Sequence, residues 1–113
     1  MLGVVLVKIS SIFAEGKLIL ILAGELDHHT AKEAMLQIND KLDTYLPHMC
    51  ELDLSTLTFM DSSGIAVILK TYRRISEIGG KLWIDRVSPQ PMKVLDASGI
   101  DRLISIAQNQ EVR

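Results

Sequence analysis

Apolar residues fall into five short runs along the chain, and polar residues between them predict turns and loops. Residues 18–22 are apolar without interruption between Gly16 and Gly24, which is the pattern of a central strand covered on both faces. Residues 50–55 instead alternate apolar and polar, as a strand does when only one face is buried. We predict strands at residues 4–9, 18–22, 50–55, 81–85 and 103–106, with a linker at 10–16 and a loop at 25–29.

Three segments between these runs carry apolar residues at the three- and four-residue spacing of a helix. Thr30 followed by Glu33 is the sequence pattern of a capping box. Ser88 is a good N-cap residue, and the proline after it suits a first helical position. We predict helices from Thr30 to Pro47, from about Ser63 to Glu77 before Gly79-Gly80, and from Pro89 to Gly99.

The resulting element order is β-β-α-β-α-β-α-β. It predicts a single α/β domain over residues 1–113, in which an N-terminal hairpin joins parallel strands in a mixed sheet with helices packed on it. We expect the first few residues and residues 107–113 to fray.

The composition excludes several classes of function. The chain is 48% hydrophobic and carries a net charge of −2 without a basic run, which argues against nucleic acid or a membrane as partner. The single cysteine, Cys50, cannot form an internal disulfide, and we predict no metal site and no cofactor. The N-terminus has no signal-peptide pattern, and the apolar runs are too short to span a membrane. We therefore expect a cytoplasmic protein.

Asp61, Ser62 and Ser63 follow the predicted strand at residues 50–55 after a short turn, and they open the second predicted helix. Such residues cap a helix by accepting hydrogen bonds from its free N–H groups, and one of the three suffices. A serine at a helix N-terminus can also carry a phosphoryl group, since the helix dipole favours negative charge there. Both interpretations stay open on spacing alone.

Three blocks of the sequence resemble a known family. Phe59-Met60-Asp61-Ser62-Ser63-Gly64, followed by an apolar helix, resembles the phosphoacceptor region of STAS domains, and more narrowly that of anti-sigma factor antagonists of the SpoIIAA type. Gly24-Glu25-Leu26-Asp27-His28-His29-Thr30-Ala31 is similar to the loop after the family's central strand, and Ile78-Gly79-Gly80 to the end of its phosphosite helix. The family's fold usually ends with a further helix, which we expect this chain to lack.

The resemblance implies a bacterial regulator of sporulation or of a stress response that is not an enzyme. Its unphosphorylated form would bind an anti-sigma factor that is also a serine kinase, and so release the sigma factor. Phosphorylation of Ser62 would end this binding, and a serine phosphatase would restore it. The matched blocks place the partner surface at Asp27, His28, Thr30, Asp61, Ser62, Ser63 and Gly64.

Other functions stay open at this point. The domain could serve another partner-switching or stress-signalling complex, or bind a nucleotide itself, although the sequence holds no phosphate-binding loop motif. A hydrolase is disfavoured because the serines lack a Gly-x-Ser-x-Gly frame, and His28 and His29 are weak candidates for a base. A receiver-like phosphoacceptor at Asp53 or Asp61 would need convergent carboxylates, and the first predicted strand ends in Ile9-Ser10-Ser11.

Overall fold

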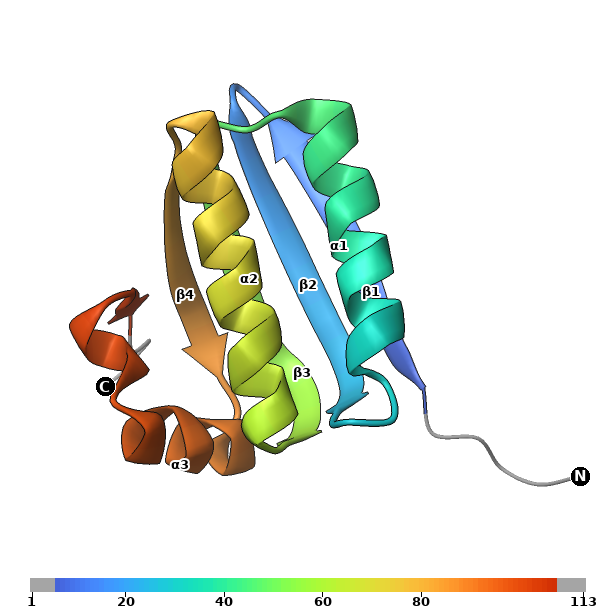
Figure 1. Cartoon of the computed structure of the whole chain (residues 1–113), viewed down its shortest axis with the longest axis vertical. Helices are drawn as coiled ribbons and strands as arrows, with labels where there is room; N and C mark the ends of the chain where they lie inside the picture. Colours follow the sequence, from blue (N-terminus) through green and yellow to red (C-terminus); the bar gives the residue numbers. More distant parts are fainter. Residues whose placement is uncertain (1–5, 108–113) are drawn as a thin grey trace, which may run out of the picture.

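The strands form one sheet in the order β1-β2-β3-β4-β5, seen here in a computed structural model that describes residues 6–107 (Figure 1). β1 and β2 pair antiparallel, and all other neighbours are parallel, so the predicted mixed sheet is confirmed. The strands are β1 (Val7–Ala14), β2 (Lys17–Leu26), β3 (Met49–Met60), β4 (Lys81–Val87) and β5 (Ser105–Ala107). The helices are α1 (Ala31–Tyr45), α2 (Ser62–Ile78), α3 (Pro89–Ser98) and the short 3-10 helix η1 (Ile100–Arg102).

The N-terminal hairpin is longer than predicted. The expected linker at residues 10–16 is wrong, because β1 continues to Ala14 and only Glu15 and Gly16, both with positive φ, form the turn. Ser10 and Ser11 read as turn residues, but they pair with Ile21 and Leu20 in the ladder. A strand at the edge of a sheet can carry polar side chains, so the polar residues of β1 did not reveal how far the strand extends. Residues 4 and 5 of the predicted strand lie outside the described part of the chain.

β2 and β3 also run further than their apolar patterns. β2 includes Gly24 and Glu25, which we expected to bound or follow it, and Gly24 has φ +94°. A side chain at Gly24 would overlap the carbonyl oxygen of Leu6, so glycine is required. β3 runs on to Met60 with two register shifts against β2, so no turn precedes α2. These shifts break the polar–apolar alternation after Ser55, which is where our prediction stopped.

α1 and α2 cover the same face of the sheet (Figure 1). Each parallel connection moves one strand further in the same direction, and right-handed crossovers then place their helices on one side. Leu18, Leu20 and Leu22 point into this core and are fully buried. Ile19 and Ile21 point to the opposite face and are half-buried, so the expectation that β2 is covered on both faces is wrong for the described chain.

The C-terminal part follows the predicted order with shifted bounds. β4 ends two residues later than predicted, and η1 precedes a last strand at Ser105–Ala107 rather than 103–106. Ala107, expected to fray, is therefore in β5. The remaining residues expected to fray, and any helix after β5, lie outside the described part.

Candidate functional site

The two sequence blocks meet where β2 and β3 end side by side. Leu26 and Met60 are paired as the last residues of their strands, and the N–H of Asp61 donates to the carbonyl oxygen of Leu26 at 3.3 Å. Asp27 and Asp61 therefore each follow one of two adjacent strand ends. The structure thus brings together the two blocks that the sequence places about thirty residues apart.

Residues 27–30 form a tight turn organised by Asp27 and Thr30. The Asp27 carboxylate accepts hydrogen bonds from the N–H groups of His29 at 2.9 Å and Thr30 at 3.1 Å. The Thr30 hydroxyl donates to the carbonyl oxygen of Glu25 at 2.8 Å and accepts from the N–H of Asp27 at 3.0 Å. Thr30 is buried and makes no cap hydrogen bond, so the predicted capping box with Glu33 is wrong.

These hydrogen bonds also set the charge state of Asp27. Partial desolvation acts to raise its pKa, but the N–H groups of His29 and Thr30, the Thr30 hydroxyl and the nearby His29 favour the ionised form. The balance lowers the pKa of Asp27 below its usual value. The turn therefore holds a fixed negative charge at neutral pH.

Asp61, Ser62 and Ser63 have different surroundings at the N-terminus of α2. Asp61 is the N-cap, and its carboxylate accepts from the N–H of Ser63 at 2.7 Å, which confirms the capping interpretation. α2 begins at Ser62, one residue earlier than predicted. Ser62 is exposed, whereas Ser63 is half-buried. Ser62 is thus the more accessible hydroxyl.

Gly64 is buried beneath this helical turn. A Cβ at this position would overlap the Cγ of Met60 and lie 2.6 Å from its Sδ and 3.2 Å from the Cγ of Leu26. The lack of a side chain therefore lets α2 pack directly on the ends of β2 and β3. Its part in binding a partner stays a prediction.

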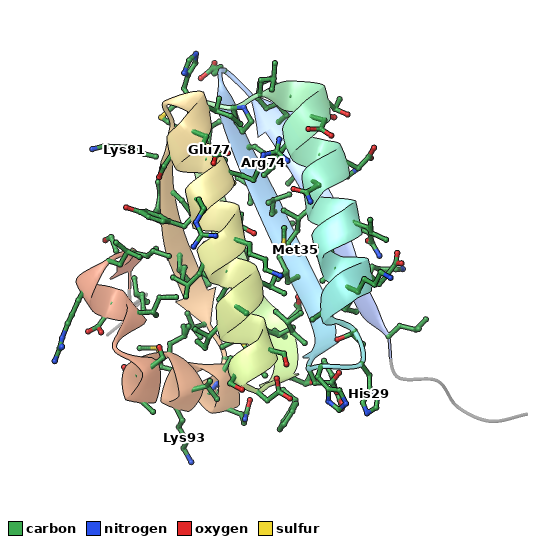
Figure 2. All side chains as sticks on the ribbon, viewed as in Figure 1. His29, Met35, Arg74, Glu77, Lys81 and Lys93 are labelled. Carbon is green, nitrogen blue, oxygen red and sulfur yellow. The ribbon has the colours of Figure 1, made fainter. Side chains whose placement is uncertain are left out.

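His28 and His29 project from the turn into solvent. Both are exposed, and their rings pack against each other with centroids 3.9 Å apart. Figure 2 shows His29 at the end of the turn. His28 lines a surface hollow together with Ser63, so this predicted residue does lie beside the serines. No hydrogen bond joins either imidazole to a serine within residues 6–107, as a nucleophile and its base would require.

Sequence reasoning missed Gln90 of α3, which fixes the other side of the site. Its amide side chain accepts from the N–H of Met60 at 2.8 Å and donates to the carbonyl oxygen of Met60 at 3.0 Å. Ser88 adds a hydrogen bond from its hydroxyl to the carbonyl oxygen of Leu57. The Ser88-Pro89 pattern revealed the helix start, but no local signal points to contacts thirty residues away.

The other candidate chemistry has no counterpart in the described chain. Residues 6–107 contain no group of three or more His, Cys, Asp or Glu side chains able to hold a metal ion. Asp53 lies in the middle of β3 and accepts from the N–H and hydroxyl of Ser55. None of the described helices is both long and apolar enough to cross a membrane.

The chain is similar to known proteins both in sequence and in fold. The chain is 38% identical to the anti-sigma F factor antagonist of Paenibacillus polymyxa over 95 residues, covering 84% of this chain and 81% of the relative. Its fold superposes on the anti-sigma factor antagonist SpoIIAA in unphosphorylated form with a TM-score of 0.73 at 24% identity, covering 90% of each chain. The fold also superposes on the phosphorylated form of the Bacillus cell fate determinant SpoIIAA with a TM-score of 0.65 at 24% identity, covering 91% of this chain and 92% of the other. The STAS domain model matches residues 5–112, and the chain therefore belongs to the STAS domain family.

Proposed function

We propose that this protein is an anti-sigma factor antagonist that acts by binding, has no catalytic activity of its own, and works in the bacterial cytoplasm. The names of a relative and of a structural neighbour support the general function, since both are anti-sigma factor antagonists. The partner is an anti-sigma factor, which on binding this protein releases its sigma factor.

We further propose that phosphorylation of Ser62 switches this binding off. The observation that carries the proposal is the exposed Ser62 hydroxyl at the first position of α2, where a kinase can reach it without unfolding the domain. We take Asp27, His28 and Ser63 as further contact residues of the partner, since His28 and Ser63 line one hollow and Asp27 lies in the same turn as His28. Thr30, Asp61 and Gly64 hold the two strand ends in place. The neighbour known in unphosphorylated and phosphorylated forms supports this interpretation.

The switch needs only a local change of charge. A phosphoryl group adds about −1.5 to −2 charges at neutral pH. At Ser62 this charge adds to those of Asp61 and the ionised Asp27, and any acidic partner surface is repelled. The helix dipole of α2 tolerates the group at its N-terminus, so the fold persists. The kinase is the anti-sigma factor itself, and a serine phosphatase reverses the reaction.

The direct experiment incubates the protein with ATP and the anti-sigma kinase of the same genome, then maps the modified residue by mass spectrometry. We expect one phosphoryl group on Ser62 and loss of the complex after modification. Ser62→Ala is the unmodifiable control, and Ser63→Ala, which leaves Ser62 in place, is the matched variant that must still be phosphorylated. Modification at Ser63, or a complex that survives phosphorylation, contradicts the proposed switch.

A further inference from the structure

A groove between α1 and α2 begins beside the switch and runs along both helices. It consists of two hollows, of about 410 and 440 Å³, which share Met35 and Lys70. One end is lined by His28 and Ser63, and the other by Arg74 and Glu77. Figure 2 shows Met35 between the two helices and Arg74 and Glu77 further along α2. We call this surface the α1–α2 groove.

The floor and the rim of this groove differ in chemistry. Ala31, Met35, Ala66 and Val67 supply its apolar lining, and we call this apolar lining the floor of the groove. Lys32, Lys70 and Arg73 line its rim and are exposed, and Glu77 is the one acidic lining residue among those described. A protein with a net charge of −2 therefore presents a local strip of positive charge here.

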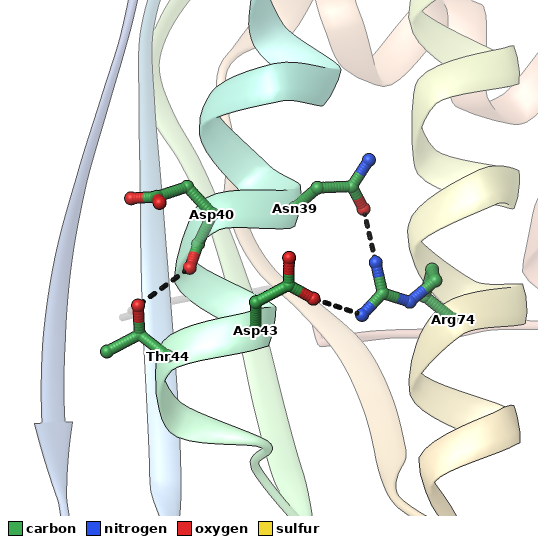
Figure 3. Close-up of polar contacts among 5 residues, drawn as sticks. All are labelled: Asn39, Asp40, Asp43, Thr44 and Arg74. Atoms are coloured by element: carbon green, nitrogen blue, oxygen red, sulfur yellow. Dashed lines mark hydrogen bonds and ion pairs between the residues drawn. The ribbon is translucent and has the colours of Figure 1, made fainter.

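These rim cations are available to a partner. Within residues 6–107 the ion pairs join Lys17 to Glu51 and Arg74 to Asp43, so Lys32, Lys70 and Arg73 take part in neither. Arg74 instead ties the helices together, donating to Asn39 at 2.8 Å and to Asp43 at 2.9 Å across the groove (Figure 3). The walls are thus held in place while the cations near the switch remain free.

We propose that the α1–α2 groove docks an acidic, amphipathic segment of the anti-sigma factor, with apolar side chains on the floor and carboxylates against Lys32, Lys70 and Arg73. The choice of occupant rests on charge complementarity and on the apolar floor. This inference rests on the proposed function, and it identifies the groove as the surface whose binding phosphorylation of Ser62 would disrupt. A phosphoryl group on Ser62, at the end of the groove marked by Ser63, repels such a segment directly.

The first test reverses the charge of the rim. We compare the complex formed with the anti-sigma factor of the same genome by Lys32→Glu/Lys70→Glu and by Lys8→Glu/Lys81→Glu. The control lysines are exposed and follow the sheet alternation onto the face opposite the groove, and the net change in charge is equal. We expect the groove variant to bind at least about tenfold more weakly, with a smaller dependence on salt, and the control to bind normally.

The second test identifies what lies in the groove. Cys50 is fully buried, and burial beside the Glu51 carboxylate raises the pKa of its thiol to about 12, so it does not compete for labelling. Ala66→Cys introduces an accessible thiol at the groove, to which a photo-crosslinker is attached before the complex forms. We expect the cross-linked partner peptide, identified by mass spectrometry, to be rich in Asp and Glu.

The outcomes separate this inference from the proposed function. If the groove variant binds like the wild type while Ser62→Asp does not bind, the groove assignment is overturned and the switch stands. Equal weakening of the groove and control variants also overturns it, because the attraction is then not local to the groove. A cross-link to a basic segment does the same. Failure of the wild-type protein to bind the anti-sigma factor overturns both proposals.

Discussion

Gly64 lies directly over Met60, so close that a Cβ on Gly64 would lie only 2.2 Å from the Met60 Cγ. The first turn of the helix that carries Ser62 is thereby seated on the ends of two strands. Glycine in the first turn of a helix would ordinarily be a weakness, since alanine favours a helix by about 1 kcal/mol. Here the absence of a side chain is required for packing.

We therefore expect Gly64→Ala to lower the free energy of unfolding by about 1–3 kcal/mol, because it overpacks the core against the fully buried Met60. Urea unfolding measures the change. The matched control is Ala66→Gly, two residues further along the same helix at an exposed position. This change should lower the free energy of unfolding by about 1 kcal/mol, because glycine has the lower helix propensity. A Gly64→Ala protein more stable than the wild type would show that the turn can move away from Met60.

Removing the helix cap should weaken the site without unfolding the protein. Asp61→Ala loses the hydrogen bond from the N–H of Ser63, and we expect stability to fall by about 1 kcal/mol. Asp61→Asn retains a side-chain oxygen as acceptor and should keep most of this stability. If Asp61→Asn folds normally yet is not phosphorylated by the anti-sigma kinase, its charge also serves recognition. Equal stability of Asp61→Ala and the wild type would contradict the capping role.

Substitutions at Ser62 should fix the switch in one state. Ser62→Ala should bind the anti-sigma factor constitutively in the presence of ATP, because it offers no hydroxyl to modify. Ser62→Asp should bind more weakly, although one carboxylate carries less charge than a phosphoryl group. Isothermal titration with and without ATP measures both. Loss of binding by a folded Ser62→Ala protein would count against the switch.

The pH dependence of the turn follows from the lowered pKa of Asp27. A carboxyl whose pKa is lowered in the folded state adds stability above its unfolded pKa and loses it as the pH falls through the folded value. We expect the stability difference between the wild type and Asp27→Asn to be largest at neutral pH and to vanish in acid. NMR titration of the Asp27 carboxyl group should give a midpoint below the ordinary value of about 3.9. A midpoint above it would refute the assigned hydrogen bonds.

The centre of the sheet should not tolerate a charge. Leu20 is fully buried in β2, so Leu20→Asp places an unpaired carboxylate in the core and should unfold the domain at room temperature. Circular dichroism and the one-dimensional proton NMR spectrum report the outcome. Ser10→Asp, at an exposed position of the neighbouring strand β1, should fold normally. A folded Leu20→Asp protein would mean that β2 is wrongly placed.

Local patterns were enough to predict the element order and a capping residue among Asp61, Ser62 and Ser63. Strand and helix periodicity, glycine stops and cap residues act within a few positions of themselves, so the sequence alone reveals them. Thr30 is a residue whose role the local pattern did not predict. Its pattern matched a capping box, but its hydroxyl oxygen accepts from the N–H of Asp27 instead of from the helix, and its hydroxyl hydrogen goes to the carbonyl oxygen of Glu25.

The parts that escaped prediction depend on contacts between distant segments. Lys32 and Lys70 are thirty-eight positions apart in the sequence, and only the packing of α1 beside α2 brings them to the same groove. Gln90 bonds to Met60 from α3, and two elements, α2 and β4, separate that helix from β3 in the sequence. The true end of β3 was hidden because its register shifts are imposed by pairing with β2.

Those register shifts constrain how this protein can vary in length. β3 takes two more residues than β2 to travel from the Ile21–Asp53 pair to the Leu26–Met60 pair. Because strand side chains alternate, deleting one residue between them would move Met60 to the exposed position of Phe59 and bring Asp61 into the buried position of Met60. A single-codon deletion there would uncouple Ser62 from the Asp27 turn while leaving both residues intact. Insertions and deletions in this segment should therefore be inherited only in compensating pairs.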